Sequence, residues 1–185
     1  MNRTMKPRRK KRALFDPRYV PIESRRVNVW TLIALLSILM FFFFQRFIVA
    51  LGIVTDRSML PTLTEGSTFL VNKYITHFRP LHRGEIVVLR PQKLAQEQYV
   101  KRVIGLPGET ISIQGGKVFV NGQPLEEPYA RGASYPDLPP RALKEGSYFV
   151  MGDNRPESQD SRHFGAVPSD QIEGKIKPGQ WFTAS

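Results

Sequence analysis

A run of 18 residues without a charged side chain, residues 27–44, restricts the fold of this chain more than any other feature. A helix that crosses a bilayer needs about 17–25 mainly apolar residues, so the run is long enough for one span. Its apolar residues would occupy every face of a helix, which favours contact with lipid over one-sided packing in a core. We therefore expect a transmembrane helix over residues 27–46, with Arg46 at the far interface.

Two other interpretations of this run remain open. Residues 50–52 (ALG) have the small residues of a signal-peptide cleavage site, although the basic region before the run is long for a signal peptide. Cleavage there would also leave Ser58 a few residues from a new N-terminus. The run could instead be a buried core helix, but a helix that is apolar on all sides fits lipid better.

Positive charge is concentrated before the run. Up to Arg26 the chain has ten Lys and Arg residues and two acidic residues, whereas the whole chain has a formal charge of +11. Basic flanks of a span stay in the cytoplasm, so we expect residues 1–26 to form a basic cytoplasmic tail and residues 47–185 to lie outside the cytoplasm. The lipid bilayer is the expected partner of the tail and span. Because little net charge remains beyond the tail, we expect no nucleic acid partner.

Beyond the run, short apolar segments rich in β-branched residues predict a mostly β fold. The 185 residues allow one such domain besides the anchor. Gly-Gly at 115–116 and Asn-Gly at 121–122 predict tight turns, and the proline-containing segment 129–144 predicts a loop or small flap. The expected strands are residues 47–54, 68–71, 85–90, 99–104, 110–114, 117–120, 148–151 and 172–176.

The residue types present restrict the chemistry. The chain has no cysteine, which removes disulfides, thiolate nucleophiles and zinc–cysteine sites. Its three histidines are His77, His82 and His163, and their spacing fits no common metal motif, so we expect no metal and no cofactor. His77 and His82 lie in a polar, turn-like segment, where a solvent-exposed histidine is the expected state. A Ser-His-Asp site is therefore not indicated, and a serine activated by lysine is the recognised alternative.

Ser58 directly follows the segment 47–54, and a lysine that serves as its base must be neutral. The lysine pKa must then fall from about 10.4 to about 7–8, which disfavours the charged form by about 4 kcal/mol. Burial among apolar side chains can supply this shift. Lys101 in YVKRVI and Lys73 in LVNKYI both meet the requirement, and composition does not separate them. Either could also be an edge lysine that points to water.

A third segment, residues 151–165, follows an apolar strand and is dense in groups that form hydrogen bonds. Taken alone, its Gly-Asp-Asn start favours a solvated Asx-type turn. Together with the two preceding segments, however, it resembles the conserved boxes of type I signal peptidases, the Ser-Lys enzymes that remove signal peptides from exported proteins. The matching motifs are SMLPTL (58–63), YVKRVIGLPGE (99–109) and GDNRPESQDSRHFG (152–165), in the family's order and after an N-terminal anchor. The resemblance covers residues 47–174, except for the segment 129–144.

This resemblance implies a signal-peptidase-like, β-rich extracytoplasmic domain tethered to the plasma membrane by one N-terminal signal-anchor helix. The implied activity is a serine endopeptidase that cleaves preproteins after small residues of the Ala-x-Ala type. Ser58 would be the nucleophile and Lys101 the general base, in preference to Lys73. The implied partners are the signal peptides of exported preproteins, and the secretion translocase is a candidate partner of the basic tail.

The resemblance also assigns supporting residues in the third segment. Ser158 would hydrogen-bond the Lys101 amine and orient it. Asp160 and Arg162 would form an ion pair that holds the segment near the dyad, while Asp153 and Asn154 would be structural.

One position departs from the family pattern. The backbone N–H of Ser58 would face the developing oxyanion, a contact commonly worth about 2.7–4 kcal/mol. Many members carry a serine two residues before the nucleophile, whose hydroxyl assists the oxyanion, whereas this chain has Asp56 there. An ionised carboxylate cannot donate and would repel the oxyanion, so we expect Asp56 to point away. The second oxyanion donor is then unidentified.

A peptide bound extended beside a strand edge alternates its side chains, so its residues at −1 and −3 face the same wall. We expect this wall to be apolar and shallow, which admits alanine, glycine or serine. The residues expected to build it are Val54, Met59, Leu63, Tyr99 and Val100.

Two other functions compete. A self-cleaving Ser-Lys peptidase of the repressor type shares the chemistry, but it should have a DNA-binding helical domain and no span. A membrane-tethered, non-catalytic binding protein would account for the basic tail but would leave the three motifs unexplained.

Overall fold

The structure, a computed structural model, describes residues 28–47, 49–73, 79–91, 97–177 and 181–182. The chain divides into two compact units, residues 1–37 and 38–185. The basic tail expected over residues 1–26 lies outside the described residues.

Helix α1 extends over Val29–Phe47, close to the range expected for a span. Asn28 caps its start, because the side-chain oxygen accepts a hydrogen bond of 3.2 Å from the N–H of Trp30. The apolar side chains described on this helix are exposed; Leu36, for example, is 62% exposed. Within the described part of the chain, no helix is long and apolar enough to cross a membrane.

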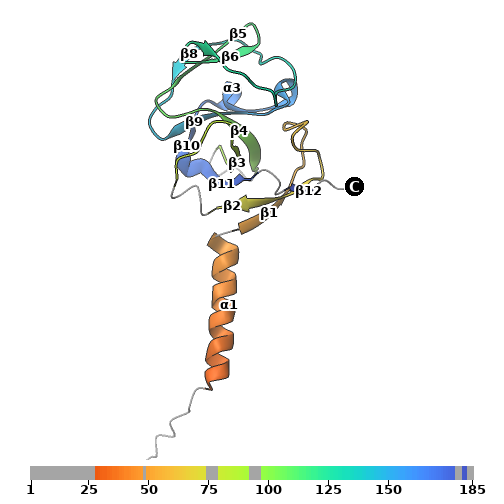
Figure 1. The fold of residues 1–185 in the computed structure, drawn as a ribbon, viewed down its shortest axis with the longest axis vertical. Coiled ribbons are helices and arrows are strands. Elements are labelled where there is room, and N and C mark those ends of the chain that lie inside the picture. The colour runs from red at the N-terminus through yellow and green to blue at the C-terminus, as the bar shows by residue number, and fades with distance from the viewer. Residues whose placement is uncertain (1–27, 48, 74–78, 92–96, 178–180, 183–185) are drawn as a thin grey trace, which may run out of the picture. The chain divides into compact units, whose positions relative to one another are not determined.

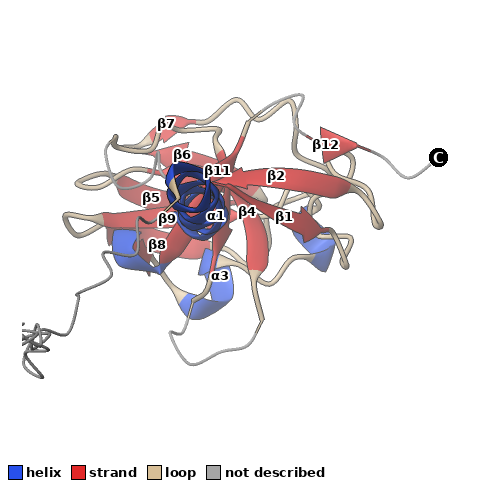
Figure 2. Cartoon of the chain, turned by 90° about the horizontal axis from the view of Figure 1, so that it is seen from below, coloured by secondary structure: helices blue, strands red, loops and turns tan. Residues whose placement is uncertain are grey.

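The prediction of a mostly β fold is confirmed, because strands are the commonest elements after α1 (Figures 1 and 2). Three short helical turns complete the described elements. They are η1 (Arg155–Glu157), α3 (Ser161–Phe164) and η2 (Ser169–Gln171). The strands are β1 (Val49–Ile53), β2 (Thr68–Asn72), β3 (Ile86–Leu89), β4 (Tyr99–Gly105), β5 (Thr110–Gln114), β6 (Lys117–Val120), β7 (Gln123–Pro124), β8 (Leu138–Ala142), β9 (Ser147–Met151), β10 (Val167–Pro168), β11 (Ile172–Ile176) and β12 (Trp181–Phe182).

These strands form two antiparallel sheets. The larger has the order β1-β2-β11-β3-β4-β9-β10, with β12 paired to β2, and the smaller has the order β7-β6-β5-β8. In Figure 1 the strands β5, β6 and β8 gather at one end of the β-rich region, and β1 and β2 lie at the other. Strand β1 is therefore an edge strand, whereas β4 lies between β3 and β9.

Two expectations of local structure are wrong. Phe47 is the last residue of α1 and not the first residue of a strand. The segment 129–144, expected to be a loop or small flap without a strand of its own, contains strand β8, in which buried Leu138 pairs with Ile113 of β5. Strand β8 is at the edge of the smaller sheet, where a proline costs no ladder hydrogen bond. The prolines in this segment therefore did not exclude a strand.

The expected glycine turn is present. Gly115 and Gly116 have positive φ angles of 55° and 77°, and they join β5 to β6. This backbone region suits glycine and matches the twist of a two-residue hairpin.

Three apolar clusters meet at β4. Ile104 packs with residues of the smaller sheet, and Val103 packs with residues of β3, β9 and β11. Val100 packs against a third cluster that includes Met59 and Val71. A side chain in the middle of β4 is consequently surrounded by the core of the fold.

Candidate active site

Lys101, in the middle of β4, has no exposed surface. Its Nζ lies 2.6 Å from the hydroxyl oxygen of Ser58 and donates a hydrogen bond to it. Burial lowers the pKa of Lys101 below its ordinary value of 10.5, while the nearby charges of Asp56 and Asp160 oppose part of this effect. A lysine with a lowered pKa is neutral in a larger fraction of molecules, as a base must be.

Lys73, the alternative base, does not share this environment. It follows the last residue of β2 and is only half-buried. Full burial, which the sequence could not assign to either lysine, therefore distinguishes Lys101 from Lys73.

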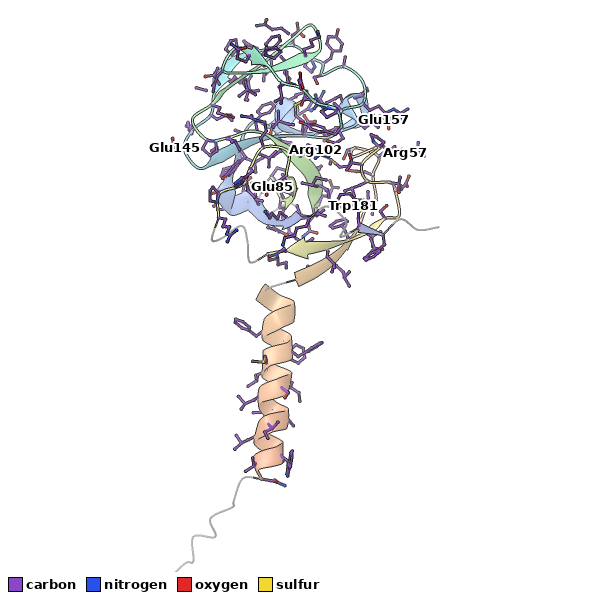
Figure 3. The ribbon with its side chains drawn as sticks, in the orientation of Figure 1. Arg57, Glu85, Arg102, Glu145, Glu157 and Trp181 are labelled. Atoms are coloured by element: carbon purple, nitrogen blue, oxygen red, sulfur yellow. The ribbon has the colours of Figure 1, made fainter. Side chains whose placement is uncertain are left out.

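Ser58 lies in the turn after β1 and is 2% exposed. The third sequence segment holds the backbone of this turn. The backbone N–H of Asn154 donates to the Ser58 carbonyl at 2.9 Å, and the Asn154 side-chain amide donates to the Arg57 carbonyl at 3.0 Å. The same amide donates to the Glu157 carboxylate at 3.2 Å, and Figure 3 shows Arg57 and Glu157 on the same side of the β-rich region. Asn154 thus fixes the nucleophile turn from a segment almost a hundred positions away.

Asp56 does not point away from Ser58, contrary to the sequence-based expectation. Its Oδ1 accepts a hydrogen bond of 3.1 Å from the backbone N–H of Ser58 and one of 2.9 Å from the Ser58 hydroxyl. An Asp side chain readily accepts from a backbone N–H two residues further on, which is the geometry of an Asx turn. The hydrogen bond to the Ser58 N–H satisfies this preference, which is why the Asp56 carboxylate faces Ser58.

Asp160 and Arg162 form a buried, bidentate ion pair. Nε and Nη2 of Arg162 lie 2.8 Å from Oδ1 and Oδ2 of Asp160. The Asp160 carboxylate also accepts from the Gly152 N–H at 3.0 Å, which ties the pair to the end of β9. Burial alone would raise the pKa of Asp160, but the hydrogen bonds and charge of Arg162 outweigh it and lower the pKa. Asp160 therefore remains an anion inside the fold.

Ser158 lies beside this pair, and its hydroxyl does not hydrogen-bond the Lys101 amine. Its hydroxyl is buried and has no hydrogen-bond partner among the residues that the structure describes, so the expected bond to the Lys101 amine is absent. The Ser158 hydroxyl lies near the Asp160 carboxylate and helps to lower its pKa, although the two groups do not meet the geometry of a hydrogen bond. It also faces Gly152, where an added Cβ would lie 2.2 Å from the Ser158 oxygen.

Asp153 binds Arg102, a residue that sequence reasoning did not select. Nε and Nη2 of Arg102 lie 2.8 Å and 2.6 Å from the two carboxylate oxygens of Asp153. The Thr62 hydroxyl donates to the same carboxylate at 2.5 Å, and the Arg102 guanidinium lies 4.1 Å from the centre of the Tyr129 ring. Arg102 follows Lys101 directly, and adjacent residues of a strand point to opposite faces. A charged residue next to the expected buried lysine was the sequence signal that Arg102 needs a partner on the other face of β4.

Gly152 and Arg155 were also missed. A Cβ on Gly152 would lie 2.5 Å from the Ser58 carbonyl oxygen, so this position allows close approach of the nucleophile turn. Arg155 is buried and binds both oxygens of Glu127, at 2.9 Å and 2.6 Å, as well as the Ser134 hydroxyl. This contact joins the third segment to the polypeptide between β7 and β8.

The expected substrate wall is largely inside the core. Met59 and Leu63 have no exposed surface and Val54 is buried, whereas Tyr99 and Val100 are half-buried. The Leu63 N–H donates to the Met59 carbonyl at 2.9 Å, and this turn buries both side chains. Only Tyr99 and Val100 of the five residues are therefore placed to contact a ligand at the surface.

Neither described histidine hydrogen-bonds Ser58 or Lys101. His82 and His163 are exposed, His163 accepts a hydrogen bond of 3.5 Å from the backbone N–H of Asp160, and His77 lies outside the described residues. No group of three or more His, Asp or Glu residues in the described ranges could hold a metal ion. What the site provides is a buried amine in contact with a hydroxyl, a pair that can perform nucleophilic catalysis.

Comparisons with known proteins give a consistent result. The sequence profile of the family described as "Signal peptidase, peptidase S26" matches residues 27–181. A signal peptidase I of Leptolyngbya laminosa is 37% identical over 153 residues, which are 79% of this chain and 75% of the relative. A signal peptidase I of Bacillus caldolyticus is 37% identical over 172 residues, which are 85% of this chain and 91% of the relative. Among solved structures, a signal peptidase I from Enterococcus faecalis is 32% identical with a TM-score of 0.47, covering 54% of this chain and 98% of that chain.

Proposed function

Because this chain belongs to the signal peptidase family, peptidase S26, we propose that Ser58 and Lys101 carry out the reaction of that family. The protein is a serine peptidase that removes signal peptides from preproteins. The observation that supports the assignment of residues is the 2.6 Å contact between Lys101 Nζ and Ser58 Oγ in a buried environment.

In the proposed reaction, neutral Lys101 accepts the hydroxyl proton of Ser58 as Oγ forms a bond to the scissile carbonyl carbon. The carbonyl π electrons move to oxygen and give a tetrahedral oxyanion. As the C–N bond breaks, the protonated Lys101 transfers its proton to the leaving amine. Water then attacks the acyl-enzyme with Lys101 again as base, and Ser58 recovers its proton when the ester bond breaks.

The supporting residues hold this pair in place. Asn154 holds the nucleophile turn, and the ion pair of Asp160 with Arg162 anchors the segment that carries Asn154. The ion pair of Asp153 with Arg102 joins that segment to the strand of Lys101. Positioning of this kind matters because a displacement of about 1 Å can reduce catalysis about 100-fold.

The preprotein binds as an extended strand in this proposal. Strand β1 lies at the edge of the larger sheet and leads directly into the Ser58 turn, so its unpaired backbone groups are available for β-strand addition. Tyr99 and Val100 contact the small side chains before the cleaved bond. A shallow surface of this type favours substrates with alanine, glycine or serine at −1 and −3.

The proposal includes an organisation into a cytoplasmic tail (1–26), a transmembrane helix (27–46) and an extracytoplasmic catalytic domain (47–185). The uncharged run at 27–44 and the positive charge before it support a single span at the plasma membrane. In the larger sheet, Ile53 pairs with Thr68, and Thr68 pairs with Phe182, so two exposed apolar side chains share one face. This face contacts the lipid bilayer, and the translocase is a candidate partner of the tail.

Protease added to sealed cells tests the orientation. We expect the catalytic domain to be degraded while the tail is protected. Protection of the catalytic domain in intact cells, with degradation after lysis, would reverse the orientation.

The catalytic assignment is tested by cleavage of a preprotein with the purified full-length protein in detergent. We expect Ser58→Ala and Lys101→Met to lose measurable cleavage, and Lys73→Met to retain the wild-type rate as the matched lysine control. Wild-type rates in either of the first two variants would show that the dyad is assigned wrongly.

A further inference from the structure

The Asp56 carboxylate hydrogen-bonds both groups of Ser58 that the proposed reaction needs, the backbone N–H and the hydroxyl. One oxygen, Oδ1, accepts from both the backbone N–H and the hydroxyl of Ser58. Lys101 in turn donates to the same hydroxyl, so the hydrogen bonds run from Lys101 to Ser58 to Asp56. Ser58 is the one hydrogen-bond partner of this carboxylate in the described part of the chain, and Asp56 itself is exposed.

This arrangement opposes acyl transfer in two geometric ways. The Ser58 N–H is needed by the oxyanion, but it is bound to a carboxylate oxygen. The Ser58 hydroxyl proton must go to Lys101, but it points to Asp56. A substrate carbonyl oxygen that approaches the Ser58 N–H would meet the carboxylate at about the position that it must occupy.

We propose that Asp56 is a positioning residue that holds the free enzyme in a resting state, and that the scissile carbonyl of the bound preprotein displaces its carboxylate from Ser58. The proposal rests on the Ser58–Lys101 dyad. Displacement requires only rotation of an exposed side chain whose described hydrogen bonds all go to Ser58. It frees the N–H for the oxyanion and lets the hydroxyl turn towards Lys101.

Displacement also changes the electrostatic environment of Lys101. Three neighbouring carboxylates favour the charged form of Lys101, those of Asp56, Asp160 and Asp153, and the Arg162 guanidinium disfavours it. The centre of the Tyr99 ring lies 5.5 Å from Nζ. The other three charges are held in buried ion pairs, whereas Asp56 is exposed and forms no ion pair in the described part of the chain. When Asp56 leaves, Lys101 loses one stabilising negative charge and releases its proton more readily.

The pH dependence of catalysis distinguishes these states. The pH profile of kcat/KM reports the free enzyme, and that of kcat reports the substrate complex. In the wild type we expect the acid limb of kcat/KM to lie at higher pH than the acid limb of kcat. A residue with a purely structural role would move neither limb.

The test uses the purified full-length protein with a fluorogenic signal-peptide substrate. Asp56→Asn keeps the shape of the side chain but removes its charge. Asp56→Ser removes the charge and shortens the side chain. We expect both variants to raise kcat/KM at neutral pH, Asp56→Ser by roughly tenfold, the scale of one hydrogen bond to a charged group. We also expect the acid limb of kcat/KM to move to lower pH and to approach that of kcat.

Glu65→Gln is the matched control, because Glu65 is an exposed carboxylate close in sequence that pairs with Arg57 and not with Ser58. We expect its kcat/KM and acid limb to equal those of the wild type. Thermal unfolding of each variant checks that the fold is retained.

The possible outcomes separate the two proposals. If Asp56→Asn and Asp56→Ser lower kcat/KM, or leave both acid limbs in place, while Ser58→Ala and Lys101→Met are inactive, the resting-state role of Asp56 is overturned and the dyad stands. Activity in Ser58→Ala or Lys101→Met overturns both.

Discussion

Nζ of Lys101 lies 2.6 Å from Oγ of Ser58, although 43 positions separate the two residues in the chain. Ser58 follows an edge strand of the larger sheet, and Lys101 lies in a strand with a neighbour on each side. The contact therefore joins the buried turn that follows an edge strand to a strand inside the sheet. Both side chains are buried, so the hydroxyl and its partner amine meet where little water reaches them.

Burial of Lys101 predicts a specific dependence of stability on pH. Its pKa is below 10.5 in the folded protein, so between the lowered value and 10.5 the unfolded chain binds more protons than the folded one. The free energy of unfolding should therefore rise with pH across this window, and this contribution should be level above 10.5. Urea unfolding at a series of pH values checks this slope. Lys101→Met should lack it and Lys73→Met should keep it; a wild-type slope in Lys101→Met would contradict the explanation.

Asp153→Asn should destabilise the fold strongly. The change leaves Arg102 without its charged partner at a site where the two side chains are 11% and 1% exposed. Breaking a buried ion pair on one side typically costs about 3–5 kcal/mol. Chemical unfolding of the variant measures this loss.

The comparison for this prediction is Glu65→Gln, which breaks the pair with Arg57. Its side chains are 67% and 57% exposed, so the effect should stay below about 1 kcal/mol. Equal losses in the two variants would refute the structural importance of the buried pair.

Ser158→Ala should retain the stability of the wild type or exceed it. The Ser158 hydroxyl is buried without a hydrogen-bond partner among the described residues, and an unsatisfied polar group costs about 1–3 kcal/mol. Thermal unfolding and preprotein cleavage should be measured on the same sample. A large loss of kcat with unchanged stability would instead indicate that Ser158 orients Lys101 during catalysis.

Gly152→Ala should lower kcat/KM by about 100-fold, because the added Cβ would lie 2.5 Å from the Ser58 carbonyl oxygen and would displace the nucleophile turn. The same Cβ would lie 2.2 Å from the Ser158 oxygen and 2.6 Å from the Ser158 Cβ. Adding Ser158→Ala to this variant removes the contact with the oxygen but leaves the contacts with the Ser58 carbonyl and the Cβ of residue 158, so activity should remain low. Full recovery in the double variant would show that the contact with the Ser158 oxygen, and not displacement of Ser58, causes the loss.

Much of the fold follows from local sequence patterns. Short β-branched segments indicated the strands, including β5, β6 and β11 at their observed bounds, and paired glycines marked the β5–β6 turn. Strand β8 was missed because its prolines indicated a loop. Prolines are tolerated in an edge strand, since the backbone groups on its outer side form no hydrogen bonds within the sheet.

The site was only partly accessible from the sequence. The motifs selected Ser58 and Lys101 together with the segment that carries Asp160 and Arg162. They did not reveal Arg102 as the partner of Asp153, since 51 positions separate the two residues and nothing in the local pattern links them. Nor did they show that Met59 lies in the core.

By itself, the sequence determined the mostly β class, the apolar run with its basic flank and the family to which the chain belongs. These depend on residue type, periodicity and motif order, which are local properties. Tertiary structure alone decided that Lys101 is fully buried and Lys73 is not, that Asp56 faces Ser58, and that the Ser158 hydroxyl has no partner in the described part of the chain. Those features depend on how distant strands pack, and a side chain's direction and solvent access exist only after that packing is complete.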